Sequence, residues 1–174
     1  MKEPGNNSET GRVTGVMQAL AWISLLVLAV LFFQDLLGRQ YNPNQAPEVG
    51  VGEDGAQEVI LQRNRQGHYV ADGAINGQPV TFMLDTGATM VALPAHLATK
   101  LGIKRGRALQ FQTANGIARG FAARLDDVAL GPITLQDVEA GITQGLTGDE
   151  VLLGMSFLKH IEFTQRGDTL TLRQ

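Results

Sequence analysis

The chain has 174 residues, enough for one domain of ordinary size with an additional segment, and its formal net charge is -3. It contains no cysteine, which excludes disulfides, thiolate metal sites, iron–sulfur clusters and cysteine nucleophiles. The absence of a basic excess argues against a nucleic-acid partner. The histidines show no spacing typical of metal ligands, so we expect neither a metal nor a cofactor; they are His68, His96 and His160.

An uncharged apolar stretch, VTGVMQALAWISLLVLAVLFF, runs from Val13 to Phe33. It is apolar all round, and a helix of that length spans roughly 30 Å, the thickness of a bilayer hydrocarbon core. We therefore predict a transmembrane helix over residues 13–37, which follows a short tail at residues 1–12. A cleaved signal peptide is the competing interpretation, but the run is long and LFFQDLLGRQ contains no small-residue cleavage site.

The composition changes after the apolar stretch. Residues 38–57 read GRQYNPNQAPEVGVGEDGAQ, in which proline, glycine and asparagine occur without an apolar period. This composition is typical of a flexible linker. Residues 58–174 consist of short runs rich in Val, Ile, Phe, Leu and Thr, and they predict a folded domain made mainly of strands.

Turn signals divide the folded domain into hairpins. Asn76-Gly77 and Asn115-Gly116 each lie between strand-like runs, and residues 166–168 suggest a third turn. Only two short helices are expected, one in PAHLATKLG after Pro94 and one at residues 155–159. The pattern predicts an all-β domain of the closed, barrel-like kind.

The segment TFMLDTGATMVALP, at residues 81–94, places an aspartate directly after an apolar strand. An aspartate there is costly unless its carboxylate is hydrogen-bonded or used. Thr86 offers a hydroxyl, and Gly87 permits a backbone turn that brings an amide close to the Asp85 carboxylate. Asp126-Asp127 and Asp149-Glu150 have no such strand before them, so we interpret the first pair as a solvated turn or strand edge and the second as loop residues.

The strand–DTGA–strand segment resembles the active-site loop of retropepsin-like aspartic proteases. A second landmark of that family, a hydrophobic-hydrophobic-glycine segment followed by a short helix, is matched by LLGMSFLKH, and the FQTANGIARGF segment has the glycine-bearing hairpin of the family's flap. The resemblance covers residues 58–174 and is closest to a bacterial, membrane-tethered branch. It implies a pepsin-like closed β-barrel half-lobe and a peptide or protein substrate.

The resemblance assigns roles to residues of this chain. Asp85 is expected to be the catalytic acid, in a loop shaped by Thr86, Gly87 and Ala88. Three residues support that loop, namely Leu152, Leu153 and Gly154. The expected flap residues that contact substrate are Thr113, Ala114, Asn115 and Gly116. Ala88 follows the retroviral type, whereas two-lobed relatives often carry Ser or Thr there.

The chain has one DTG motif and about half the length of a two-lobed enzyme, so the family mechanism requires a second copy. We expect a homodimer in which Asp85 of each chain meets at a twofold axis and the two acids activate one water. Lys2 and Arg12 precede the apolar stretch, and Arg39 is the nearest basic residue after it. This bias favours a periplasmic protease domain anchored by residues 13–37 in a bacterial inner membrane.

Two other classes of function are compatible with the sequence. One is a catalytically silent domain of the same fold that serves in dimerisation or peptide binding, and the intact Asp85-Thr86-Gly87 triplet argues against it. The other is an envelope protein that binds a glycan, which would require exposed aromatic stripes. For the flap, the alternative interpretation is an ordinary surface hairpin.

Overall fold

The structure is a computed structural model that describes residues 7–52, 54–113 and 116–174. The chain divides into two units, Met1–Gly38 and Arg39–Gln174. Helix α1, Asn7–Tyr41, belongs mainly to the first unit, and its stretch Thr14–Tyr41 is by length and composition able to cross a membrane. The helix runs beyond the predicted span and includes part of the predicted tail. It ends two residues before Pro43, whose ring disfavours helical backbone in the residue preceding it.

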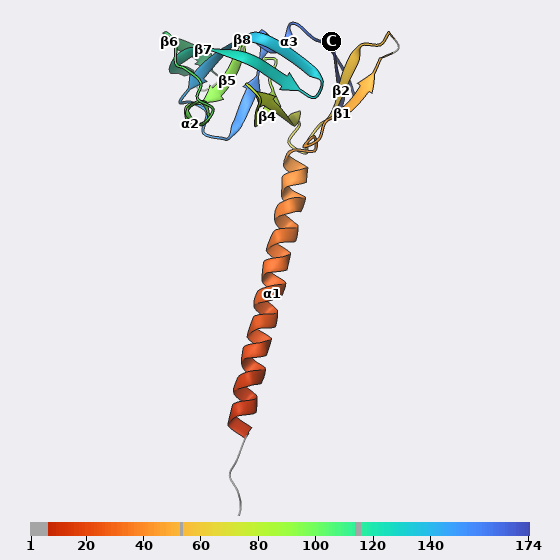
Figure 1. Cartoon of the computed structure of the whole chain (residues 1–174), viewed down its shortest axis with the longest axis vertical. Helices are drawn as coiled ribbons and strands as arrows, with labels where there is room; N and C mark the ends of the chain where they lie inside the picture. The colour runs from red at the N-terminus through yellow and green to blue at the C-terminus, as the bar shows by residue number, and fades with distance from the viewer. Residues whose placement is uncertain (1–6, 53, 114–115) are drawn as a thin grey trace, which may run out of the picture. The chain divides into compact units, whose positions relative to one another are not determined.

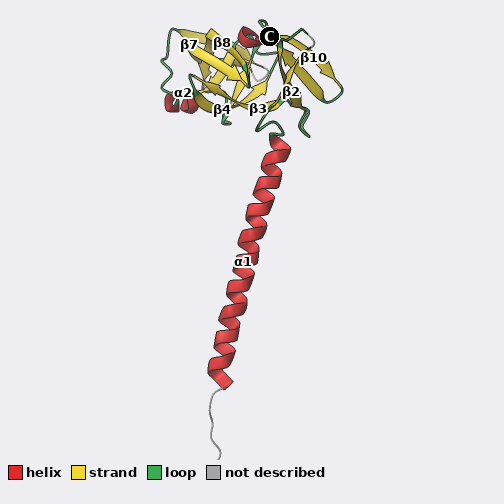
Figure 2. Ribbon diagram, turned by 45° about the vertical axis from the view of Figure 1, so that its right-hand side comes forward, coloured by secondary structure: helices red, strands yellow, loops and turns green. Residues whose placement is uncertain are grey.

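The second unit is built from strands and two short helices, as Figures 1 and 2 show. One sheet has the order β1-β2-β11-β10 and the other has the order β3-β4-β9-β5-β8-β7-β6. The elements, in chain order, are β1 Glu48–Val51, β2 Gln57–Gln62, β3 Val70–Ile75, β4 Gln78–Leu84, β5 Val91–Pro94, α2 Ala95–Lys100, β6 Ala108–Thr113, β7 Gly116–Leu130, β8 Ile133–Thr143, β9 Glu150–Leu153, α3 Met155–Leu158, β10 Glu162–Arg166 and β11 Thr169–Arg173.

The larger sheet closes on itself. Besides its sequential pairings, β3 pairs with β7 through Ala74↔Ala129 and Ile75↔Val128. Closure pairs β3 on both sides and encloses the apolar faces of the strands, while β6 pairs, within the described residues, with β7 alone. The largest side chains inside include Phe82 from β4 and Phe157 from α3, both fully buried. The all-β, closed-barrel prediction is therefore confirmed.

Local turn chemistry explains two of the hairpins. Asn76 and Gly77 join β3 to β4 with φ values of 50° and 71°, the left-handed pair that a tight two-residue hairpin requires. Gly167, with φ 60°, turns β10 into β11. Both turns lie where the sequence predicts them. The two predicted short helices are also present, as α2 and α3.

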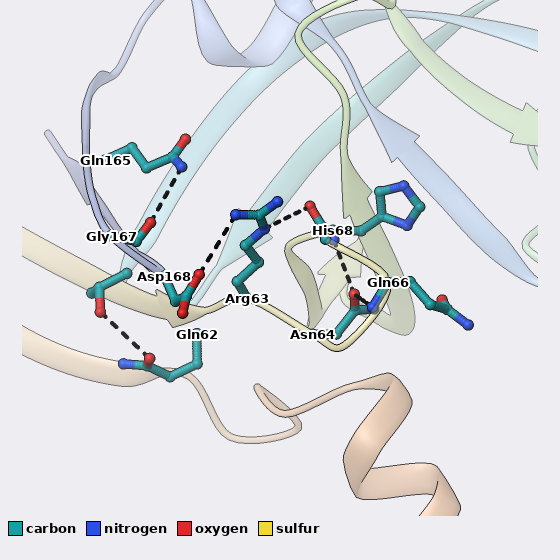
Figure 3. Close-up of polar contacts among 10 residues, drawn as sticks. Gln62, Arg63, Asn64, Gln66, His68, Gln165, Gly167 and Asp168 are labelled. Atoms are coloured by element: carbon teal, nitrogen blue, oxygen red, sulfur yellow. Dashed lines mark hydrogen bonds and ion pairs between the residues drawn. The ribbon is translucent and has the colours of Figure 1, made fainter.

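The loop between β2 and β3 packs against the β10–β11 turn, as Figure 3 shows. Asn64 Oδ1 accepts hydrogen bonds from the amides of Gln66 (3.0 Å) and His68 (2.9 Å). Arg63 donates to the Gly67 carbonyl at 3.1 Å and forms an ion pair with Asp168 at 3.5 Å. Since both partners of that pair are substantially exposed, the asparagine contributes more to the order of this loop than the ion pair.

The structure differs from the prediction of a flexible linker over residues 38–57. Helix α1 reaches Tyr41, and β1 pairs with β2 from Glu48↔Ile60 to Val51↔Gln57. Between them, the buried Asn44 donates to the carbonyl oxygens of Gln62 (2.9 Å) and Val70 (2.7 Å) and accepts from the Gln62 amide (2.7 Å). The composition suggested a linker because asparagine and proline favour turns. The same side chains satisfy buried backbone groups when distant strands supply them.

Replacing Asn44 with Ala is expected to lower the free energy of unfolding by about 3 kcal/mol, because backbone groups of Gln62 and Val70 lose their partners inside the fold. Urea denaturation of the detergent-solubilised chain, followed by circular dichroism, measures the change. Gln45→Ala is the matched control, since Gln45 is exposed, and it should stay within about 0.5 kcal/mol of the wild type. Equal losses in the two variants would restore the linker interpretation.

Candidate active site

Asp85 follows directly on β4, at the point where that strand leaves the barrel. Strand β4 runs parallel to β9, with Leu84 opposite Leu153, and the Asp85 amide donates to the Leu153 carbonyl at 3.2 Å. The strand before Asp85 is held on its inner face by the buried Phe82. The backbone of the acid is thus fixed by a buried strand pair, while its side chain remains partly exposed.

The loop itself orients the carboxylate. The Gly87 amide donates to Asp85 Oδ1 at 2.9 Å, and the Ala88 amide donates to the Asp85 carbonyl at 3.2 Å. A Cβ on Gly87 would lie 3.1 Å from the same Oδ1, a contact tight enough to disturb the turn. The amide-to-carboxylate contact expected from the sequence is therefore present, and glycine allows the close approach on which it depends.

Strand β9 lies between β4 and β5, and its end contacts the Asp85 loop. A Cβ on Gly154 would lie 2.3 Å from the Met90 carbonyl oxygen and 2.7 Å from that of Ala88, so only glycine fits. The Met155 amide then donates to the Ala88 carbonyl at 2.8 Å. The structure brings the predicted supporting residues to the loop: Leu152, Leu153 and Gly154.

Ser156 is a contributor that the sequence did not reveal. Its Oγ accepts a hydrogen bond from the Val91 amide at 2.9 Å and donates to the Glu139 carbonyl at 2.7 Å. The hydroxyl thereby joins α3 to β5, which follows the Asp85 loop, and to β8. A serine in the first turn of a helix normally faces solvent or caps the helix, so no sequence signal distinguishes this one.

Hydrogen bonds connect the start of the β4–β9 pairing to Tyr41, the last residue of α1, and to Asn42, which follows it. Asp72 Oδ1 accepts from Thr81 Oγ1 (2.8 Å) and from Asn42 Nδ2 (2.7 Å), while Tyr41 donates its hydroxyl hydrogen to Glu150 at 2.8 Å. Thr81 and Glu150 are opposite each other in the strand register. Glu150, predicted in a loop, is the first residue of β9. Residues 41–42 thus hold the two strands that carry the loop.

The predicted flap is the β6–β7 hairpin. Thr113 pairs with Gly116 at its end, where Gly116 has φ 107°, and the predicted contact residues Ala114 and Asn115 lie outside the described residues. The base of the hairpin is anchored by Phe111. A Cβ on Gly120 would meet its ring at 2.6 Å and one on Gly141 at 2.5 Å. The aromatic ring fits here because neither glycine has a side chain. The sequence did not indicate this packing.

Two charge pairs of exposed side chains lie outside the Asp85 loop, Arg124 with Asp137 and His96 with Asp149. Arg124 holds the pKa of the Asp137 carboxyl below its usual value, and the carboxylate in turn raises the pKa of Arg124. The exposed Asp149 contacts His96 at 2.8 Å. Within residues 7–52, 54–113 and 116–174, no cluster of three or more His, Asp or Glu side chains is arranged to hold a metal ion.

A family model described as "gag-polyprotein putative aspartyl protease" matches residues 71–160. The chain is also similar to a solved retropepsin-like aspartic protease from Rickettsia conorii, with a TM-score of 0.57 and 32% sequence identity. That match covers 74% of this chain and 93% of the other. The fold and the DTGA loop thus define a retropepsin-like aspartic protease. The chain belongs to the gag-polyprotein putative aspartyl protease family.

Two curated relatives carry no functional name. An "Uncharacterized protein in cobV 5'region" from Sinorhizobium sp is 37% identical over 125 residues, 69% of this chain and 53% of that protein. "Uncharacterized protein RP867" from Rickettsia prowazekii (strain Madrid E) is 31% identical over 108 residues, 60% of this chain and 46% of that protein. The chain therefore spans about half the length of the curated relatives it matches.

Gly154→Ala is expected to lower the free energy of unfolding by about 3 kcal/mol, because the added methyl group meets two fixed backbone carbonyls in a packed region. Gly50→Ala is the matched control, since its Cβ would make only ordinary contacts at 3.7 Å with Glu58. Chemical denaturation of both variants measures the difference. A fully stable Gly154→Ala protein would contradict the packing described for the loop.

Proposed function

We propose that the protein is a membrane-anchored aspartic endopeptidase that acts as a homodimer, with one Asp85 from each chain in the active site. The observation that carries the proposal is the Asp85 carboxylate at the end of a buried strand, oriented by the Gly87 amide at 2.9 Å. Membership of an aspartic protease family supports the same chemistry. The substrate is a peptide or protein, and no cofactor is required by this chemistry.

The mechanism needs two facing carboxylates. Groups about 3 Å apart cannot both ionise, so they share one proton, as in aspartic proteases generally. The ionised carboxylate removes a proton from the water between them while the protonated one donates to the peptide carbonyl oxygen. Water attacks the carbonyl carbon, and the tetrahedral intermediate breaks the C–N bond as the nitrogen gains a proton.

A second chain supplies the second acid in this proposal, because the sequence contains one DTG motif. In the single chain Thr86 and Gly87 are exposed at the tip of the loop, as a surface that pairs across a twofold axis requires. Thr86 braces the opposite loop.

The β6–β7 hairpin closes over the extended peptide, and the residues proposed to contact the substrate are Thr113, Ala114, Asn115 and Gly116. A hairpin with glycine at its tip can open to admit substrate and close to exclude water from the reaction. The Phe111 ring, packed against Gly120 and Gly141, holds the two strands of the hairpin against β8.

Residues 13–37 anchor the enzyme in a bacterial inner membrane with the protease unit on the periplasmic side. The support is the apolar helix and the larger number of basic residues before it, Lys2 and Arg12, than directly after it, Arg39. Confinement of two chains to one membrane raises their effective concentration, so the dimer can be weak in solution. We place the start of the protease domain near Arg39 rather than residue 58, because residues 41–44 and β1 pack into it.

Asp85→Asn is expected to reduce peptide cleavage by about 10³-fold or more, because the dyad loses its shared acid and base. The assay is cleavage of a peptide library by the full-length protein in detergent, across mildly acidic to neutral pH, with and without an aspartic protease inhibitor. Asp126→Asn is the matched control, since Asp126 is exposed and lies outside the loop, and it should retain activity. Equal residual cleavage in wild type and Asp85→Asn would leave the silent dimerisation or peptide-binding module as the better interpretation.

Co-expression of wild type with an excess of Asp85→Asn tests the shared site. If each active site needs two aspartates, the activity per wild-type chain should fall in proportion to the fraction of wild-type chains, because most of them pair with an inactive partner. The ratio of the two chains is measured by mass spectrometry of the purified mixture. Activity per wild-type chain that is independent of the ratio would show that a single chain, or another protein, completes the site.

A further inference from the structure

A groove of about 530 Å³ lies beside the strand that leaves the catalytic loop. Its lining joins Met90, the second residue after the DTGA motif, to the flap strand β6 and to β7 and β8. The floor is largely apolar and includes Met90 and Leu109. The rim is basic and includes Lys104, Arg105, Arg107 and Arg124. One carboxylate, Glu139, also lines the groove, at its Arg124 side.

The segment that contributes most of the groove is positively charged, although the whole chain has a negative net charge. Residues 86–125 contain six Lys or Arg and no Asp or Glu, although the formal net charge of the protein is -3. Arg124 is neutralised locally by Asp137, with Glu139 at 4.0 Å. Lys104, Arg105 and Arg107 are exposed and form no ion pair with a carboxylate of the described residues. The rim therefore presents three uncompensated cations.

The groove adjoins two elements that surround the bound peptide in the proposed function, the segment after the Asp85 loop and the β6–β7 hairpin. The Met90 sulfur lies 3.3 Å from the position of a Cβ on Gly141, where the Phe111 ring also packs. Leu109 belongs both to this groove and to a second one of about 450 Å³, lined by Arg119 and Gln144 and by no acidic residue. The basic surface thus extends along the base of the flap hairpin.

We propose that this groove, here called the basic groove, binds an acidic side chain of the peptide substrate at a position several residues from the cleaved bond. The inference rests on the proposed endopeptidase function and adds a class of substrate to it, namely extended segments with Asp or Glu flanking the cut. An exposed ion pair contributes little by itself. Several like charges in one groove select by attraction of acidic peptides and by repulsion of basic ones.

An anionic lipid surface is the main alternative occupant of exposed cations. The peptide is favoured because the apolar floor, Met90 and Leu109, connects the cations to the catalytic strand and the flap hairpin. A lipid headgroup would need no such connection. Binding of the protein to anionic vesicles, measured separately, distinguishes the two occupants.

The test uses peptides of identical sequence around the cut that carry Glu, Gln or Lys at one flanking position, moved stepwise along the peptide. The full-length wild type should cleave the best Glu peptide with a kcat/KM about tenfold above its Lys counterpart, mainly through KM, and salt should reduce the difference. Lys104→Glu/Arg107→Glu should reverse the preference. Arg105 is kept because it lies over the Phe121 ring at 5.4 Å.

Lys100→Glu/Arg166→Glu is the matched control. It changes the net charge by the same amount on exposed residues of α2 and β10 that do not line the groove, and it should preserve the wild-type preference. The proposal is overturned if the wild type shows no charge preference at any flanking position, or if the control variant alters the preference as much as the groove variant.

A binding measurement separates this proposal from the proposed catalysis. Full-length Asp85→Asn should bind the fluorescent Glu peptide about tenfold more tightly than the Lys peptide, and the groove substitutions should remove that difference. If wild type cleaves nothing while this preference holds, the catalytic proposal fails and the groove assignment stands. If the groove substitutions weaken binding only to phosphatidylglycerol vesicles and not to peptides, the acidic-peptide proposal is wrong.

Discussion

The hydrogen bond from the Gly87 amide to the Asp85 carboxylate depends on the three-strand arrangement around it. Strand β9, between β4 and β5, fixes the Asp85 amide through Leu153 and supports the loop with a glycine that leaves no room for a side chain. A carboxylate at the end of a buried strand is costly without donors, and this arrangement supplies one from the loop itself. The site is therefore a property of the strand order and not of the loop alone.

The same strands connect the site to the segment after α1. Tyr41 contacts Glu150, and Asn42 contacts Asp72, which in turn accepts a hydrogen bond from Thr81; these contacts hold the start of β9 and the middle of β4. Because β-strands are stiff when paired on both sides, a fastening at one end constrains the other. This gives residues 41–44 a part in shaping the protease unit, which a flexible linker would not have.

Charge is distributed unevenly over the proposed enzyme. The Asp85 loop is followed by a stretch without a carboxylate, residues 86–125, and most of its cations line the basic groove or the neighbouring groove along the β6–β7 hairpin. Some acidic residues elsewhere pair locally, as Asp54 does with Arg173, an interaction that lowers the pKa of the Asp54 carboxyl. Under the proposed function, a surface arranged in this way would attract acidic segments of a substrate, since unpaired like charges act together over roughly a Debye length.

The sequence alone determined the features that depend on neighbouring residues. Short runs rich in Val, Ile, Phe, Leu and Thr predicted a closed all-β domain, Asn76-Gly77 predicted its hairpin, and the DTGA segment predicted an aspartate followed by a turn that brings an amide to it. The prediction of a helix over residues 13–37 followed from the uncharged apolar run of residues 13–33. These features are local because strand period, turn conformation and helix length are set within a few residues.

Only the tertiary structure decided which distant groups meet. Asn44 bonds to Gln62 and Val70, and Ser156 joins β5 to β8, although nothing near either residue in the chain indicates its partner. The supposed linker became part of the fold for this reason, and four of the six cations of residues 86–125 came to line one groove. Polar side chains such as asparagine and serine suit turns, caps and buried networks equally well, so their role is chosen by the backbone groups that folding brings to them.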